Sequence, residues 1–286
     1  MGQYAIAVTD LHKSYGDFEA VRGISFHVER GEVFGLLGPN GAGKTTTVEI
    51  LEGYRERSAG SVSVLDEDPR RTSRDLRQRL GIVLQSSGFY PRVTVKEAVE
   101  HWALLYPKPL DPQQVIELVG LDGKEDARSA ALSGGQKRRL DLALALVGDP
   151  ELVFLDEPTT GFDPAARRAA WGVIRRLKDM GKTILLTTHY LDEAQALSDR
   201  VAIVKDGVII AEGPPSQLGV GGDRYRITYD GTNGQQVEVE TDDPTTKLHE
   251  LTGAALARGE RLEGLTVARP TLEEVYLELT EEEAAE

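Results

Sequence analysis

A glycine-rich segment between an apolar run and a helix-forming run constrains the fold of this chain more than any other feature. Residues 32–38 read Glu-Val-Phe-Gly-Leu-Leu-Gly, a nearly continuous apolar run typical of a strand buried on both faces. Residues 38–46 follow as Gly-Pro-Asn-Gly-Ala-Gly-Lys-Thr-Thr, and residues 45–54 then continue as a helix. This order of strand, glycine turn and helix predicts an α/β unit.

Further buried strands alternate with helices along the chain. The pattern predicts strands at 81–84, 152–155, 183–187 and 200–204, and helices at 164–180 and 190–197. Strands that alternate with helices predict a mostly parallel sheet covered on both faces. Residues 4–8, 23–28 and 61–65 are also strand-like. Between about 90 and 147 the spacing of apolar residues is helical, with further helices at 112–119 and 134–146, so this segment is predicted to be a helical insertion.

Composition excludes several classes of protein. The 286 residues contain 40% hydrophobic and 28% charged side chains, which is ordinary for a globular protein of about two domains. The longest run without a charged side chain, residues 80–91, is far too short for a spanning helix of about 20 residues. No basic, apolar leader is visible at the start, and no cysteine is present for disulfides or thiolate sites. These features fit a cytosolic protein.

The charge is spread unevenly. The whole chain has a net charge of −14, and residues 221–286 alone carry 6 basic and 16 acidic side chains. Such an acidic chain argues against nucleic acid as a partner, because phosphate binding needs clustered Lys and Arg. Glycines near residue 220 follow a Pro-Pro pair and mark a linker. We therefore expect one domain at 1–220 and a small acidic domain at 221–286.

The acidic segment is expected to form an accessory α+β domain. Residues 225–229 and 236–240 alternate like two strands, and residues 231–234 resemble a hairpin turn. Residues 245–258 predict an amphipathic helix with Leu248, Leu251, Ala255 and Leu256 on one face. A strand at 265–268 and a closing helix at 271–279 are expected to follow. The alternative is a solvated tail, which is the interpretation for residues 281–286.

The glycine-rich segment matches the pattern G-x-x-x-x-G-K-[ST] and predicts a phosphate cradle. Its glycines let the main-chain N–H groups turn inward, at the positive end of a helix. Lys44 is expected to reach the β- and γ-phosphates, and the Thr45 hydroxyl to bind Mg²⁺. The alternative is a turn that binds nothing. By itself the pattern indicates only a P-loop NTPase. The predicted ATP contacts in this segment are Gly38, Pro39, Asn40, Gly41, Ala42, Gly43, Lys44, Thr45 and Thr46.

Two carboxylates end the strand at 152–155. Asp156 is placed to hold Mg²⁺ beside the cradle, as a Walker-B Asp does. Glu157 is expected to face the γ-phosphate and to polarise an attacking water molecule. The alternative is that the pair only opens a turn before Pro158.

A Ser-Gly-Gly segment before this strand carries a resemblance to a known family. Together with the cradle and the Leu-Asp-Glu-Pro-Thr run, it resembles the nucleotide-binding subunits of ABC transporters over roughly residues 4–218. The family fold implies a P-loop NTPase core with an antiparallel β subdomain and a helical signature subdomain. It also implies that this segment contacts ATP bound by another chain. The signature residues are Leu132, Ser133, Gly134, Gly135 and Gln136.

The remaining family motifs follow in order and imply further site residues. Tyr15 matches the aromatic residue that stacks on adenine, and Gln85 matches the glutamine that links Mg²⁺ and water to the partner. Asp163 matches the D-loop, and His189 matches the switch histidine that senses the γ-phosphate. One departure is Phe162, where the family more often has leucine, an exchange of one hydrophobic residue for another. The implied catalytic set is Glu157, His189 and Gln85, and the implied Mg²⁺ set is Thr45, Gln85 and Asp156.

The resemblance implies an ATP hydrolase that works as half of a dimer. One cradle and one signature segment per chain suggest a homodimer with shared ATP sites. Without a spanning segment, the transport channel is expected to be a separate permease, with this chain on the cytoplasmic face of a prokaryotic membrane. Thr-Thr-Gly at 159–161 and the run at 270–279 resemble drug-resistance and ABC-2 type exporters. The alternative is a soluble ABC-type ATPase of repair, translation or cofactor assembly, although the coiled coils, zinc cysteines or second nucleotide domain of such proteins are missing.

Overall fold

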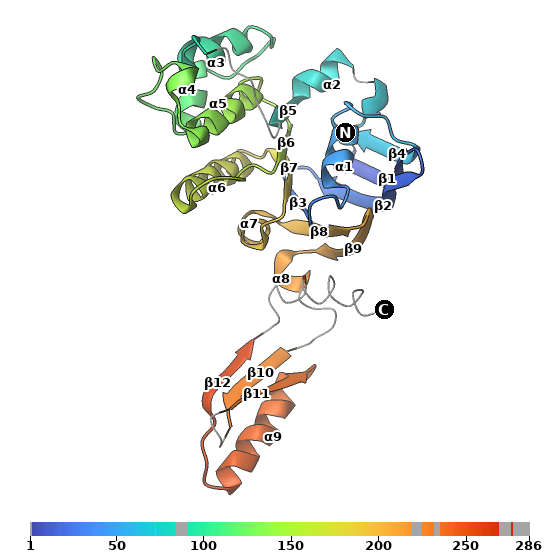
Figure 1. Ribbon diagram of the computed structural model, residues 1–286, viewed down its shortest axis with the longest axis vertical. Coiled ribbons are helices and arrows are strands. Elements are labelled where there is room, and N and C mark those ends of the chain that lie inside the picture. Colours follow the sequence, from blue (N-terminus) through green and yellow to red (C-terminus); the bar gives the residue numbers. More distant parts are fainter. Residues whose placement is uncertain are drawn as a thin grey trace. The chain divides into compact units, whose positions relative to one another are not determined.

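The computed structural model describes residues 2–71, 73–83, 91–218, 225–231, 235–268 and 276. Its contacts divide the chain into two compact units, Met1–Glu212 and Gly213–Glu286 (Figure 1). The boundary expected from the sequence, between residues 220 and 221, lies slightly later than the boundary between these units. The domains at 1–220 and 221–286 stay a prediction. No helix in the described segments is long and apolar enough to cross a membrane.

Six strands form the central sheet of the first unit, in the order β5-β6-β7-β3-β8-β9. Every residue of β3, β6 and β7 is buried, which explains why these strands read as continuous apolar runs. The pairs β5–β6, β6–β7, β7–β3 and β3–β8 are parallel, so the predicted mostly parallel sheet is confirmed. The strands are β3 (Val33–Leu37), β5 (Leu80–Val83), β6 (Leu152–Asp156), β7 (Thr183–Thr188), β8 (Arg200–Lys205) and β9 (Val208–Gly213).

The carboxyl ends of β3, β6 and β7 meet at one edge of this sheet. The register pairs Leu37 with Thr188 and Asp156 with Thr187. The loops that follow these three strands therefore begin side by side. Ligands of α/β proteins bind outside the carboxyl ends of the strands, so this edge is where a site is expected.

A second, antiparallel sheet has the order β2-β1-β4. Its strands β1 (Tyr4–Tyr15) and β2 (Phe18–Glu29) are longer than the sequence suggested, because their polar halves also pair, as Ser14 does with Glu19. The third strand is β4 (Ala59–Val64). A hydrophobic core joins this sheet to the central one, and the rings of Phe26 and Phe34 stack within it at 5.3 Å. The expected antiparallel subdomain is present.

Helices cover both faces of the central sheet (Figure 1). Helix α1 (Lys44–Leu51) lies on the side of the antiparallel sheet and contacts β2, β4 and β6. On the other side lie α6 (Pro164–Asp179) and α7 (Leu191–Leu197), which contact each other. The short helix α2 (Arg74–Arg79) leads into β5.

The predicted helical insertion holds α3 (Val95–Ala103), α4 (Pro112–Leu118) and α5 (Gly134–Leu146). Each helix begins at a capping residue: Thr94, Asp111 and Ser133 accept hydrogen bonds from main-chain N–H groups of the first turn. Their apolar faces form one core with β6, β7 and α6. The insertion is therefore continuous with the core of the sheet that it interrupts.

The second unit contains α8 (Pro215–Leu218), β10 (Tyr225–Asp230), β11 (Gln236–Thr241), α9 (Pro244–Ala257) and β12 (Glu263–Ala268). Its antiparallel sheet has the order β11-β10-β12, and its small core includes Ile227 and Ala255, both buried. Leu256 was expected on the inner face of the helix but is 73% exposed, because a core this thin covers only part of the helix. Turn residues 232–234 and the expected helix at 271–279, apart from Tyr276, lie outside the described residues.

Candidate nucleotide-binding and hydrolysis site

The loop after β3 has a main-chain path that only glycine can follow. Gly43 has a φ of 97°, and a Cβ there would lie 2.5 Å from the carbonyl oxygen of Ala20. A Cβ on Gly38 would lie 2.1 Å from the carbonyl oxygen of Val204. The loop is thus pressed against the main chain of β2 and β8. Since Gly43 caps α1 without a side-chain hydrogen bond, the first N–H groups of α1 can donate to an anion.

Lys44 spans this loop from within. Its Nζ donates to the carbonyl oxygens of Gly38 at 2.7 Å and Pro39 at 2.9 Å, and the residue is 5% exposed. Burial lowers the pKa of Lys44, while the nearby carboxylates of Glu157 and Asp156 raise it. A buried cation with these neighbours is suited to bind phosphate oxygens. Thr45, next to it, is exposed, and Thr46 is half-buried.

Asp156 and Glu157 are joined at the end of β6 by one hydroxyl. Thr187 Oγ1 donates to Asp156 Oδ1 at 2.5 Å and accepts a hydrogen bond of 3.0 Å from the main-chain N–H of Glu157. Glu157 has a φ of 46°, a conformation that costs energy for a side chain other than glycine. Its carboxylate Oε2 accepts from Thr160 Oγ1 at 3.1 Å. The structure therefore holds Glu157 in one strained orientation.

His189 follows β7 and meets this carboxylate. Its Nδ1 lies 3.2 Å from Oε1 of Glu157, and the Glu157 side chain is only 11% exposed. The ring of Tyr190 packs against the imidazole, with 4.1 Å between the centroids. Two residues that the sequence singled out separately thus form one hydrogen-bonded pair at the edge of the sheet.

The donors at this edge suit Mg²⁺ bound together with a nucleotide. Within the described segments, no group of three or more His, Asp or Glu side chains gathers to hold a metal. Mg²⁺ usually takes one or two protein oxygens and completes its shell with phosphates and water. The carboxylate of Asp156 and the exposed hydroxyl of Thr45 fit that chemistry. Gln85, the third predicted ligand, lies outside the described residues.

The signature segment begins α5. Ser133 Oγ accepts from the Gln136 N–H at 3.3 Å, while Gln136 Oε1 accepts from the Ser133 N–H at 2.9 Å. Leu132 is buried and anchors the segment. Gly134 is exposed and Gly135 is half-buried, and a Cβ on Gly134 would have no neighbour within 4 Å. In Figure 1, α5 and α1 lie on opposite sides of the central sheet. The fold therefore does not place the signature segment over the cradle of the same chain.

The last two predicted contacts are both accessible. Asp163 caps α6, since its Oδ1 accepts from the N–H groups of Ala165 and Ala166 at 2.8 Å each. Tyr15 is 40% exposed, and its ring has Lys13 Nζ and the Arg55 guanidinium 5.0 Å and 5.3 Å from its centroid. An exposed ring flanked by cations can stack on a base and leave room for the phosphates.

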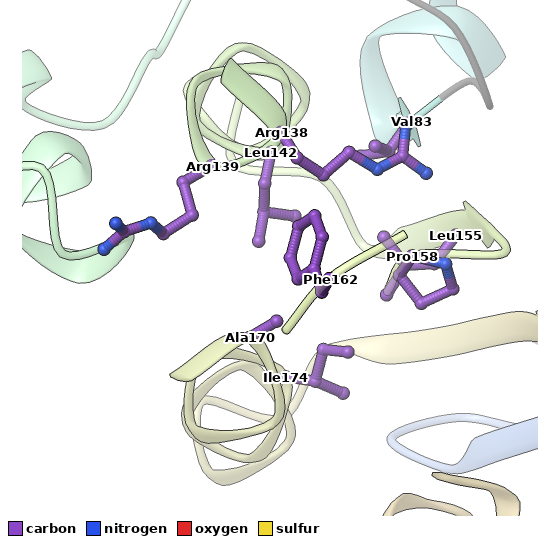
Figure 2. A pocket seen from close by; sticks show the side chains of 9 residues that line it. All are labelled: Val83, Arg138, Arg139, Leu142, Leu155, Pro158, Phe162, Ala170 and Ile174. Carbon is purple, nitrogen blue, oxygen red and sulfur yellow. The ribbon is translucent and has the colours of Figure 1, made fainter. Parts of the chain in front are cut away.

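A small apolar pocket lies beneath the D-loop, between α5 and α6. Figure 2 shows the ring of Phe162 between Leu142 of α5 and Ala170 and Ile174 of α6. The bulkier residue at this position is thus accommodated on apolar side chains. The departure from leucine leaves the capping contacts of Asp163 intact.

Three further residues contribute to this edge and were not predicted from the sequence. Thr187 lies two residues before His189, in the Thr-Thr-His run. Arg138, in the Lys-Arg-Arg run after the signature, donates to the main-chain carbonyl of Asp156 at 2.7 Å. Glu52 is a buried acid at the end of α1, where burial, and then the charges of Asp156 and Glu49, raise its pKa to about 8. Its position directly after the apolar pair Ile50-Leu51, at the end of a predicted helix, was the signal that could have found Glu52.

Residues 21–160 match the family described as ABC transporter. Nod factor export ATP-binding protein I of Paraburkholderia xenovorans (strain LB400) is 45% identical over 230 residues, which cover 76% of this chain and 73% of that protein. The chain belongs to the ABC transporter family. Its ABC fold also matches cbiO1 from Clostridium perfringens, part of the ABC transporter complex cbiONQ. The TM-score is 0.70 at 28% identity, over 77% of this chain and 92% of that one.

The likeness extends through the second unit. The protein of Rhizobium sp. (strain N33) with the name Nod factor export ATP-binding protein I is 38% identical and covers 98% of both chains. As an ABC transporter ATP-binding subunit of the exporter type, the chain hydrolyses ATP in a reaction coupled to transport. Subunits of this kind act with a second ATPase subunit and a separate membrane permease.

Proposed function

We propose that this chain forms a homodimer that closes around ATP and drives export through a separate permease at the cytoplasmic face of a bacterial membrane. The observation that carries the proposal is the pair Glu157 and His189, 3.2 Å apart at the strand edge beside the cradle. The bacterial relatives are named for the export of Nod factor. For this chain we propose export, and an exported molecule in the range of drugs, lipids and polysaccharides.

The cradle binds the phosphates. N–H groups of residues 38–46 donate to the β- and γ-phosphate oxygens, and Lys44 exchanges its two loop carbonyls for those oxygens. The hydroxyl of Thr45, the carboxylate of Asp156 and Gln85 hold Mg²⁺, which neutralises phosphate charge when it is bound. Thr187 fixes the orientation of Asp156 through its 2.5 Å hydrogen bond. Tyr15 stacks on the adenine.

Glu157 acts on the attacking water. Its strained main chain and the hydrogen bond from Thr160 aim the carboxylate, which accepts a proton as the water oxygen approaches the γ-phosphorus. With both ring nitrogens protonated, His189 donates from Nδ1 to Oε1 and from its other nitrogen to a γ-phosphate oxygen. Such positioning, rather than covalent catalysis, accounts for most of the acceleration of phosphoryl transfer.

The dimer supplies the part that one chain lacks. The N-terminus of α5, with the exposed Ser133 and Gly134 and the half-buried Gly135, offers N–H groups and a hydroxyl to the γ-phosphate held by a second chain. Because α5 and α1 lie on opposite sides of the sheet, this contact requires a partner (Figure 1). Asp163, at the exposed start of α6, lies on the segment that faces the partner. Hydrolysis breaks the bond between the γ-phosphorus and the leaving ADP oxygen. The γ-phosphate then no longer links the two chains, and they separate.

The proposal is tested with Glu157→Gln in the full chain. We expect ATP binding to remain and hydrolysis to fall by at least a hundredfold, because only the proton-accepting charge is lost. The variant should also accumulate as a dimer in ATP, measured by light scattering after size-exclusion chromatography. Glu117→Gln, which changes an exposed carboxylate on α4, is the matched control. Hydrolysis by Glu157→Gln near the wild-type rate would remove Glu157 from this role.

A further inference from the structure

A fully buried carboxylate lies behind the strand edge. Glu193 of α7 has 0% exposure. Its Oε1 accepts hydrogen bonds from Thr159 Oγ1 at 2.8 Å and from Trp171 Nε1 at 3.0 Å. Its Oε2 is buried and has no hydrogen-bond partner among the described residues. Burying a carboxylate costs desolvation free energy unless hydrogen bonds offset it. The hydrogen bonds from Thr159 and Trp171 therefore fix the position of the Glu193 side chain.

Thr159 connects this carboxylate to the proposed catalytic base. It lies two residues after Glu157 and is itself fully buried. Between them the chain turns tightly, because the N–H of Thr160 donates to the carbonyl of Glu157 at 3.3 Å and that of Phe162 to the carbonyl of Thr159 at 3.1 Å. The strained φ of Glu157 is thus fixed by Thr187 on one side and by Thr159 on the other.

Glu193 also belongs to the segment that carries the switch histidine. Helix α7 begins at Leu191, two residues after His189. Two polar contacts therefore join the same two segments: Glu157 with His189, and Thr159 with Glu193. Together with the covalent chain, these contacts close a ring through the loops after β6 and β7. A ring with two fixed contacts leaves little freedom in the position of Glu157 relative to His189.

Trp171 contributes to the same carboxylate but not to the turn. It lies on α6, more than two turns beyond the capping residue Asp163. Its indole holds Glu193 in place, while its own loss would leave the Thr159 hydrogen bond intact. Removing the Trp171 donor therefore tests the loss of a buried hydrogen bond alone. Removing the Thr159 donor also detaches the turn after Glu157 from α7.

We propose that Glu193 is a positioning residue for ATP hydrolysis, which acts through Thr159 to hold the turn of Glu157 against the loop of His189. The proposal rests on the proposed role of Glu157. It requires an acceptor at Glu193 Oε1 rather than a charge, since no cation is paired with this carboxylate in the described part of the chain. A Gln side chain can supply the same acceptor.

The test compares Thr159→Val with Trp171→Phe in the full chain. Each variant removes one donor to the same oxygen. Thr159→Val keeps the shape of the side chain, and Trp171→Phe keeps an aromatic ring of smaller volume, so both should lower the thermal midpoint, the second variant more than the first. We expect kcat to fall at least tenfold in Thr159→Val, with the ATP dissociation constant within about twofold of wild type, because a small displacement of a catalytic group costs this much. Trp171→Phe should keep kcat within about twofold. Thr159→Ser, which restores the hydroxyl, should recover most of the rate.

Glu193→Gln and Glu193→Leu add a second comparison. The glutamine variant should retain hydrolysis, and the leucine variant, where it folds, should lose it. Equal losses of kcat in Thr159→Val and Trp171→Phe, in proportion to stability, would show a structural role only and overturn the proposal. Glu157→Gln is measured in parallel. If it loses activity while Thr159→Val does not, the positioning role alone is wrong, and if Glu157→Gln stays active, the proposed function fails first.

Discussion

Nη2 of Arg138 donates a hydrogen bond of 2.7 Å to the main-chain carbonyl of Asp156. Arg138 lies on α5, the helix that Ser133 begins, so this bond joins the signature helix to the end of the strand that holds the proposed Mg²⁺ ligand. Burial lowers the pKa of Arg138, while Asp141 and Asp156 raise it. The guanidinium therefore joins α5 to the residue whose carboxylate is the proposed Mg²⁺ ligand.

Removal of this link should reduce both stability and hydrolysis. Arg138→Met leaves the buried carbonyl without its donor, and we expect a loss of about 1–3 kcal/mol in the free energy of unfolding. Hydrolysis should fall several-fold because Asp156 is less well positioned. Both are measured on the full chain, by urea denaturation and by phosphate release.

Arg139→Met is the matched control. Arg139 Nη1 donates at 2.6 Å to the carbonyl of Gly120, which follows α4 and is remote in sequence from β6. This variant should lose comparable stability but keep its hydrolysis rate per folded molecule. Equal losses of hydrolysis in the two variants would contradict a specific role of Arg138.

A mixing experiment tests whether the ATP sites are shared between chains. Ser133→Asp keeps a good helix cap but sets a negative charge where the γ-phosphate should lie. Lys44→Ala empties the cradle of its cation and should weaken ATP binding more than tenfold. Each variant alone should be nearly inactive. A mixed dimer contains one intact composite site, so mixing should restore a part of the activity.

Recovery of activity on mixing depends on whether the ATP sites are shared between chains, because each variant alone is inactive. Lys124→Ala, an exposed lysine outside the site, serves as the control for the charge change. Hydrolysis that does not recover on mixing, or that is independent of concentration in the wild-type chain, would contradict shared sites.

Local sequence patterns predicted many residues of this candidate site. Contacts between residues far apart in the sequence could not be predicted. The phosphate cradle could be predicted because its strand, glycine turn and helix are consecutive in the sequence. Asp156 could be predicted as a ligand because it ends an apolar run. The pairing of Glu193 with Thr159 joins residues 34 positions apart, and it depends on which strands are neighbours. Hydrophobic patterns show that a strand is buried but not which strand lies beside it. The polar halves of β1 and β2 were missed for the same reason.

Truncation after Leu218 should preserve nucleotide binding. The two hydrophobic cores of the first unit draw their buried residues from positions up to Val204, so this unit has a complete interior of its own. We expect the ATP dissociation constant of the truncated chain to stay within about twofold of wild type, measured by calorimetry. Assembly with the second subunit or the permease should weaken. Loss of ATP binding would show that the domain boundary is misplaced.

The buried carboxyl of Glu52 should make the stability of the chain depend on pH. Burial, with the charges of Asp156 and Glu49, raises its pKa from 4.5 to about 8 in the folded state. Between these values the folded chain keeps a proton that the unfolded chain releases. The contribution is therefore fully present below pH 4.5 and is lost as the pH rises toward 8. Glu52→Gln, which stays neutral, should remove this part of the slope.

The measurement is urea denaturation of wild type and Glu52→Gln at pH 5.5 and 7.5, without nucleotide. Other groups titrate equally in both chains, so the difference between them isolates Glu52. We expect Glu52→Gln to gain about 2–3 kcal/mol on wild type between the two pH values, at about 1.4 kcal/mol per pH unit. The exposed Glu117→Gln should show no such gain. A constant difference between wild type and Glu52→Gln would mean that Glu52 is already ionised in the folded chain at pH 5.5.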